Sequence, residues 1–112
     1  MAQIGGYLSP AEHLEFKRYA AQFQLKDSSL ANLLLARELR LRRLSDLKAS
    51  YLRSTPLPQR SRITAHQADA AVKAAFEAQA REAGLSPDQA AAIVFRAELG
   101  ERWLERSIHI RS

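Results

Sequence analysis

The sequence contains no cysteine, which excludes disulfide bonds, thiolate metal ligands and cysteine nucleophiles. No apolar run approaches the length of a membrane span, and no signal peptide is visible at Met1. We therefore expect a soluble, cytoplasmic protein that makes no contact with a membrane.

Residue patterns typical of catalysis are also missing. The chain has no nucleophile–base pattern, no glycine-rich phosphate loop and no paired-carboxylate arrangement. Its histidines, His13, His66 and His109, lie far apart and lack the i, i+4 spacing of metal ligands. We expect a protein that is not an enzyme and that holds neither a metal nor another cofactor.

The charge of the chain is unevenly distributed. Of its 112 residues, 17 are Lys or Arg and 12 are Asp or Glu, so the net charge is +5. Residues 1–60 hold ten basic and five acidic side chains, whereas residues 61–112 hold seven of each. A basic first half favours a polyanionic partner, with nucleic acid ahead of a membrane surface. The alternative is that the charge serves solubility alone.

The longest periodic stretch runs from residue 26 to residue 52 and contains neither glycine nor proline. Asp27, Ser28 and Ser29 supply candidate N-cap side chains at its start, and leucines then recur at helical spacing. This pattern predicts one long amphipathic helix. The arginines in its middle do not share one face, so either solvation or phosphate contact can explain them. They are Arg37, Arg40, Arg42 and Arg43.

Helix-start signals divide the rest of the first half. An extended segment at 1–8 precedes Ser9, whose capping box begins a helix that we expect to run to about Gln24. Pro56 and Pro58 forbid helix and mark a linker.

The second half has the same order of elements. We expect a short strand at 59–63, then a helix that begins with a capping box at Thr64 and runs to about Ala83. Ser86 caps a final helix that should end near Arg106 and contain Trp103 as a core or interface residue.

A shift of 60 residues aligns the two halves without a gap from Phe16 to Leu44. Upstream, Leu8 and Ser9 align with Ile63 and Thr64 at an offset of 55. The pattern favours an internal duplication over chance similarity between two amphipathic helix pairs. Identical residues meet at Phe16/Phe76, Ala20/Ala80, Leu25/Leu85, Glu38/Glu98, Leu39/Leu99, Arg42/Arg102 and Leu44/Leu104.

Each half thus consists of a short strand, a helix and a longer helix, and this order resembles the ribbon-helix-helix family of DNA-binding proteins. The resemblance rests on QIGGYLSPAEHLEFKRYAAQFQLKDSSLANLLLARELR in the first half and RSRITAHQADAAVKAAFEAQAREAGLSPDQAAAIVFRAEL in the second. It implies a mainly α fold class, with tandem ribbon-helix-helix units forming a single-chain pseudo-dimer or a homodimer. The units would span 1–53 and 59–106, with a Pro-containing linker at 54–58 and a loose tail at 107–112.

The resemblance also implies a site. Two strands would pair antiparallel and enter the major groove, where their outward side chains read bases. Those side chains would be Gln3, Gly5, Tyr7, Arg60 and Arg62. The start of the second helix of each unit would bind a phosphate through backbone amides, at Ser28–Ser29 and at Asp88–Gln89. Lys17, Arg18 and Lys26 are alternative phosphate contacts. Gly6 at an inward strand position and Asp88 at a phosphate position depart from the family pattern.

These features predict a non-catalytic protein that binds double-stranded DNA through a two-stranded ribbon. By resemblance its role would be that of a transcriptional repressor, or of a plasmid maintenance or conjugative-transfer (relaxosome) accessory factor with a relaxase or toxin as protein partner. The alternative is a helical protein–protein interaction module that does not bind DNA, with the leucine-rich helix and Trp103 as the partner surface.

Overall fold

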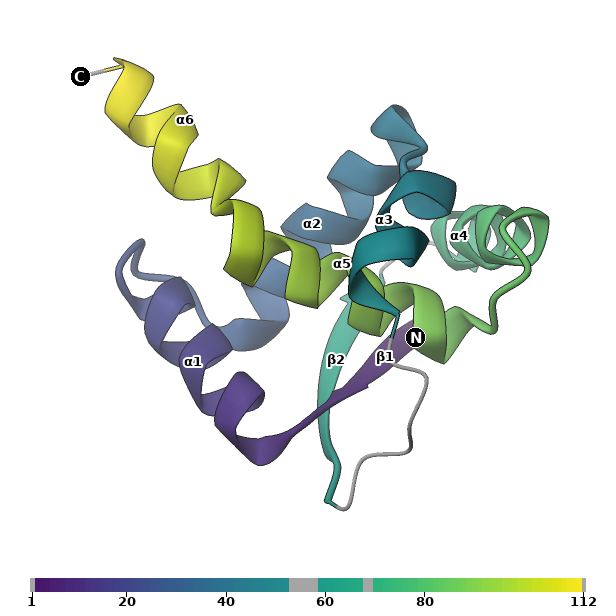
Figure 1. The fold of residues 1–112 in the computed structure, drawn as a ribbon, viewed down its shortest axis with the longest axis horizontal. Coiled ribbons are helices and arrows are strands. Elements are labelled where there is room, and N and C mark those ends of the chain that lie inside the picture. The colour runs from purple at the N-terminus through teal and green to yellow at the C-terminus, as the bar shows by residue number, and fades with distance from the viewer. Residues whose placement is uncertain (1, 53–58, 68–69, 112) are drawn as a thin grey trace.

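The computed structural model describes residues 2–52, 59–67 and 70–111 (Figure 1). Strand and helix order is the same before and after residue 60. The elements are β1 (Ala2–Leu8), α1 (Pro10–Ala21), α2 (Asp27–Leu41), α3 (Leu44–Tyr51), β2 (Ser61–Gln67), α4 (Ala70–Glu82), α5 (Pro87–Glu101) and α6 (Trp103–Arg111). The predicted linker at 54–58 lies outside the described residues.

The two strands form one antiparallel ribbon, so the segments around Ile4 and Ile63 do pair. Gly5 lies opposite Thr64 at its centre, and Ala2 and Leu8 lie opposite Gln67 and Ser61 at its ends. One face of the ribbon is buried, because inward side chains alternate with outward ones along each strand. The buried side chains are Ile4, Leu8, Ile63 and Ala65.

The predicted fold class, a tandem pair of strand-helix-helix units, is wrong. The described chain is mostly helical, with six helices and a single two-stranded sheet. Each strand is followed by three helices, because each predicted long helix is divided in two. The division falls at Arg42 and at Arg102, which have left-handed backbones with φ of 53° and 52°.

A buried glutamate accompanies each break. Glu38 and Glu98 lie one turn before the left-handed arginines, and their side chains are turned towards the start of the next helix. The Glu38 carboxylate accepts a hydrogen bond from the backbone N–H of Arg43. The Glu98 carboxylate accepts one from the backbone N–H of Leu104 at 2.9 Å. Both glutamates therefore satisfy an otherwise unpaired amide at the start of the next helix, at the N-cap of α3 and in the first turn of α6.

Several predicted boundaries also need correction. Strand β2 continues to Gln67, so Thr64 lies within a strand and does not begin a capping box. The described part of the following helix begins at Ala70, and α6 continues to Arg111 where a loose tail was expected. By contrast, the capping box predicted at Ser9 is present, and Ser86, predicted as a cap, forms a capping box with Gln89.

Helix α5 is the centre of the core. It packs against β1, and its residues from Ala90 to Phe95 are all buried. A Cβ atom at Gly6 would lie 2.7 Å from the backbone nitrogen of Ala92, so glycine allows the helix and the strand to touch. This explains Gly6, which departs from the pattern of the ribbon-helix-helix family. None of the helices in the described part of the chain is long and apolar enough to span a membrane.

Candidate nucleic-acid interface

The outward face of the ribbon is the candidate site. Three cross-strand pairs make up this face, and none of their side chains points into the core. They are Gln3 with His66, Gly5 with Thr64, and Tyr7 with Arg62. Neither strand contains an acidic residue. The ribbon face therefore carries polar, aromatic and basic side chains together.

Two arginines lie against this face, one at its end and one over its centre. The guanidinium of Arg60 lies over the Tyr7 ring, 4.7 Å from its centroid. The Arg62 side chain crosses the ribbon over Gly5, where an added Cβ would lie 2.0 Å from its Nε atom. Glycine at position 5 thus leaves room for the arginine, and this explains why a predicted base-reading position has no side chain. We call Tyr7, Arg60 and Arg62 the arginine end of the ribbon.

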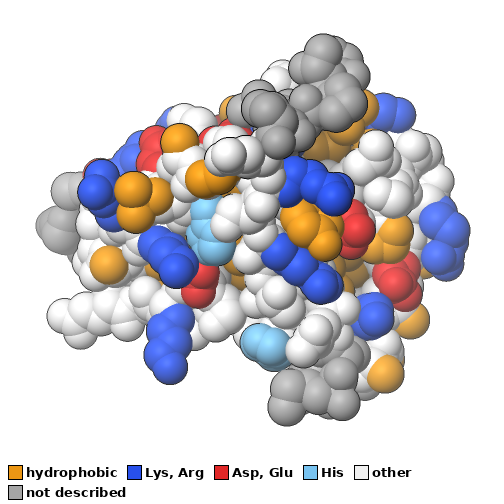
Figure 2. Space-filling view, turned by 90° about the horizontal axis from the view of Figure 1, so that it is seen from below, with side chains coloured by type: hydrophobic (Ala, Val, Ile, Leu, Met, Phe, Trp, Pro, Cys, Tyr) orange, Lys and Arg blue, Asp and Glu red, His pale blue; other side chains and the backbone are white. Residues whose placement is uncertain are grey.

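The other end of the face carries the side chains of Gln3 and His66. The amide nitrogen of Gln3 lies 3.4 Å from Nδ1 of His66, and both side chains are exposed. We call this pair the glutamine end. Seen from below the view of Figure 1, blue Lys and Arg side chains and pale-blue His side chains are spread over the exposed surface (Figure 2).

A hydrogen-bonded chain connects β2 to the first turn of α2. Nδ1 of His13 lies 2.5 Å from the Ser61 hydroxyl, and Nε2 lies 2.9 Å from the Asp27 carboxylate. Because the carboxylate can only accept, Nε2 donates to it, and in a neutral ring Nδ1 then accepts from the Ser61 hydroxyl. Burial alone would raise the pKa of Asp27, but hydrogen bonds from His13 and the Ser28 amide outweigh it and lower that pKa. The two hydrogen bonds of His13 hold the start of α2 beside the ribbon.

The predicted phosphate contacts lie on α1 and at this helix start. Lys17 and Arg18 are exposed on α1, and Lys26 and Ser29 are exposed at the start of α2. The N-cap residue is Lys26, with no side-chain cap, so the predicted N-cap at Asp27–Ser29 is wrong. The Ser28 amide donates to Asp27 at 2.8 Å, and this amide is therefore already engaged.

The start of α5 lies on the other side of the ribbon. A hollow of about 180 Å³ lies between the ribbon and this helix start, and its charged lining residues are Arg62, Lys73, Glu77 and Asp88. A helix N-terminus thus flanks the ribbon on each side, and each carries an aspartate in its first turn.

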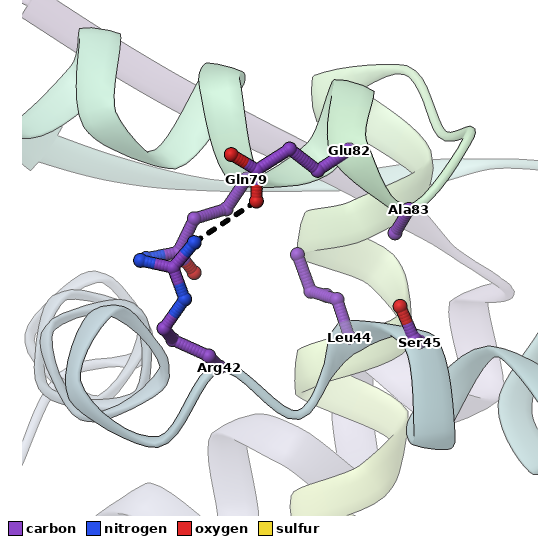
Figure 3. A pocket seen from close by; sticks show the side chains of 6 residues that line it. All are labelled: Arg42, Leu44, Ser45, Gln79, Glu82 and Ala83. Atoms are coloured by element: carbon purple, nitrogen blue, oxygen red, sulfur yellow. Dashed lines mark hydrogen bonds and ion pairs between the residues drawn. The ribbon is translucent and has the colours of Figure 1, made fainter.

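The arginines of α2 and the turn after it are engaged elsewhere. Arg43 forms two hydrogen bonds to Glu101, at 3.1 and 2.8 Å. Arg37 lies 4.1 Å from the Trp103 ring centroid and 3.8 Å from the buried Glu98 carboxylate. Arg42 reaches Glu82 at 2.9 Å across a hollow of about 50 Å³ (Figure 3). Intramolecular pairing thus accounts for these three arginines.

The sequence reasoning missed Thr64, His66 and the link through His13. A signal for the first two was present, because Arg62 to His66 alternates apolar and polar residues without interruption. The capping-box pattern at Thr64 obscured it. No local signal links His13 to Ser61, since 48 positions separate them.

Among the described residues, no group of three or more His, Asp or Glu side chains is placed to hold a metal ion. Comparison of the chain with protein-family models, curated proteins and solved structures finds no match.

Proposed function

We propose that the protein binds double-stranded DNA by placing the β1–β2 ribbon in the major groove. One observation carries the proposal: the antiparallel pairing brings Gln3, Tyr7, Arg62 and His66, from opposite halves of the chain, onto one exposed face. Without this pairing the basic and polar side chains would not share a surface.

The dimensions and chemistry of the ribbon suit that groove. The major groove of B-form DNA admits a two-stranded ribbon, and each base pair presents a distinct donor and acceptor pattern there. Arginine, glutamine and threonine are side chains that commonly contact these base edges. Neither strand carries a carboxylate, so the strands themselves do not repel DNA.

Lysines and arginines on the neighbouring helix supply the electrostatic part of the proposal. Lys17 and Arg18 on α1 and Lys26 before α2 are exposed, and the chain has a net charge of +5. Binding should therefore weaken as salt rises, because each neutralised phosphate releases counterions. The biological role that we propose is non-catalytic, as a repressor or as an accessory factor in plasmid maintenance or transfer.

Duplex binding measured by fluorescence anisotropy over a range of salt concentrations tests the proposal. We expect Arg62→Ala to weaken binding about tenfold or more, the usual consequence of losing a base contact. Arg40→Ala is the matched control. It removes the same charge from an exposed residue roughly 20 Å along α2 from the helix start. Equal binding by the two variants would remove the ribbon from the interface.

A protein-interaction module is the second candidate. Leu33 and Leu41 are 39% and 47% exposed and lie two turns apart on α2, which gives this helix an apolar outer stripe. If this stripe is the functional surface, Leu33→Ser will abolish partner binding, and the parent protein will show no salt-dependent affinity for duplex DNA.

A further inference from the structure

The two ends of the ribbon face are chemically different, although they occupy equivalent places. Gly5 and Thr64 lie opposite each other at the centre of the ribbon. A two-fold rotation about this pair would exchange the two strands, so residues at the same distance and in the same direction along the chain from Gly5 and from Thr64 occupy equivalent positions. Gln3 on β1 therefore corresponds to Arg62 on β2, and Tyr7 corresponds to His66. In a ribbon of two identical strands, the two residues at equivalent positions would be identical, and the protein would contact both DNA half-sites in the same way.

The arginine end offers hydrogen-bond donors almost alone. Each guanidinium has five N–H donors and no acceptor, and the Tyr7 hydroxyl adds one donor that can also accept. Guanine is the base with two acceptors, N7 and O6, on its major-groove edge, and arginine binds both at once. Contact with the Tyr7 ring holds the Arg60 guanidinium at this end. The Arg62 side chain starts opposite Tyr7 and carries its guanidinium over Gly5 at the centre of the face.

The glutamine end offers a mixed pattern. The Gln3 amide has both a donor and an acceptor, which match N7 and the amino group of adenine. His66 adds one ring nitrogen of each kind when it is neutral. Neither Gln3 nor His66 carries a permanent charge, so this pair lacks the preference for guanine that the Arg60 guanidinium imposes beside Tyr7 at the other end.

We propose that the protein recognises a non-palindromic duplex, with guanine in the half-site under the arginine end and with adenine favoured in the half-site under the glutamine end. This inference rests on the proposed function. It adds that the two halves of the chain, despite their common layout, are not interchangeable on DNA. The observation behind it is the juxtaposition of Tyr7 with Arg62 and of Gln3 with His66.

Selection of binding sites from a random duplex library is the first test. We expect the parent protein to enrich guanine in one half-site only. Replacing that guanine by adenine should weaken binding about tenfold or more, and the equivalent change in the other half-site should have a much smaller effect. Gln3→Arg, which makes the two equivalent positions identical, should enrich guanine in both half-sites.

The orientation of the protein on its site is the second test, and it needs no change at the ribbon face. Because the chain has no cysteine, Gln59→Cys and Ala70→Cys each create a single attachment point for an iron chelate, one before and one after β2. The chelate at position 59 should cleave DNA near the guanine half-site, and the chelate at position 70 should cleave near the other. Circular dichroism of every variant checks its folding.

A palindromic selected site, or identical cleavage patterns from the two chelates, would overturn the proposal of a non-palindromic site but not the proposal that the protein binds DNA. Failure of the parent protein to bind or enrich any duplex at low salt would instead remove the proposed function, and the inference with it.

Discussion

The α2–α3 and α5–α6 junctions share a glutamate, two leucines and an arginine sixty positions apart, yet the helices that follow them behave differently. Both junctions have a buried glutamate, an arginine with a left-handed backbone and a leucine in the next helix. After the first junction, α3 folds back and packs against α5 through the buried Leu44 and Leu47. After the second, α6 extends away from the rest of the molecule (Figure 1).

The partners of the two glutamates differ as well. Glu98 accepts a hydrogen bond of 2.5 Å from the Tyr19 hydroxyl, which itself accepts the Glu105 amide at 3.2 Å. Gln79 occupies the position equivalent to Tyr19, and its Nε2 atom donates to the Leu39 carbonyl at 3.1 Å. The residues that set the backbone are thus the same, whereas the residues that connect helices differ. The two halves share a local layout without sharing a tertiary environment.

The two glutamates should therefore contribute unequally to stability. Glu98→Ala leaves the Tyr19 hydroxyl and the Leu104 amide without their acceptor and Arg37 without its buried counter-charge. We expect a loss of about 3 kcal/mol in the free energy of unfolding. Glu38→Ala removes a carboxylate whose pKa burial raises, so its loss should be smaller, roughly 1–2 kcal/mol. Urea unfolding at pH 7 measures both, and equal losses would contradict the comparison.

The contacts of the two strands provide a second comparison. Gly6 on β1 and Ala65 on β2 are equivalent, but a Cβ at Gly6 would also lie 3.0 Å from a ring carbon of Phe95. We expect Gly6→Ala to cost roughly 1–3 kcal/mol through overpacking. Ala65→Gly should cost about 0.5–1 kcal/mol through backbone entropy. Thermal unfolding of the two variants should give the lower midpoint for Gly6→Ala, and the reverse order would place α5 farther from β1.

Tyr19 and Gln79 sharpen the comparison of the junctions. Tyr19→Phe removes one hydroxyl that makes two hydrogen bonds and should cost about 1–2 kcal/mol. Gln79→Leu loses one hydrogen bond but also removes a buried Oε1 atom that has no partner among the described residues. Its effect should be within roughly 0.5 kcal/mol of zero. A larger loss from Gln79→Leu than from Tyr19→Phe in denaturant unfolding would contradict this assignment.

The starts of α2 and α5 should differ in how their stability depends on pH. Because the pKa of Asp27 is lower in the folded state, its contribution is present above its unfolded pKa, near 4, and is lost as pH falls through the folded pKa. Asp27→Asn should therefore reduce stability at pH 7 and flatten its decline below pH about 4.

Ser86→Ala is the matched variant at the other helix start. It removes the serine of a neutral capping box with Gln89 and should cost about 1 kcal/mol equally at all these pH values. Stability measured by urea unfolding from pH 7 to pH 3 checks both variants. Parallel curves for the parent and Asp27→Asn would exclude a role for this carboxylate in acid unfolding.

Some of the candidate site could be predicted because strand alternation is a local property. The alternation of side chains along a strand predicts that Gln3, Tyr7 and Arg62 face outward, and the structure places all three on one face. His66 did not follow, because a capping-box pattern at Thr64 competed with the same alternation. The partners of Arg37 and Arg43 also could not be predicted, since Glu98 and Glu101 are about sixty positions away in the sequence.

The sequence by itself determined that an extended segment precedes the helices in each half, and where α1 and α5 begin. These properties depend on side-chain spacing and capping over a few residues. Only the tertiary structure decided that the helices break at Arg42 and Arg102. A non-glycine residue in the left-handed conformation costs about 1–2 kcal/mol, so the local sequence favours an unbroken helix. Burial of Leu44 and Leu47 against α5 can offset that cost at the first break, and such contacts exist only once distant parts of the chain have come together.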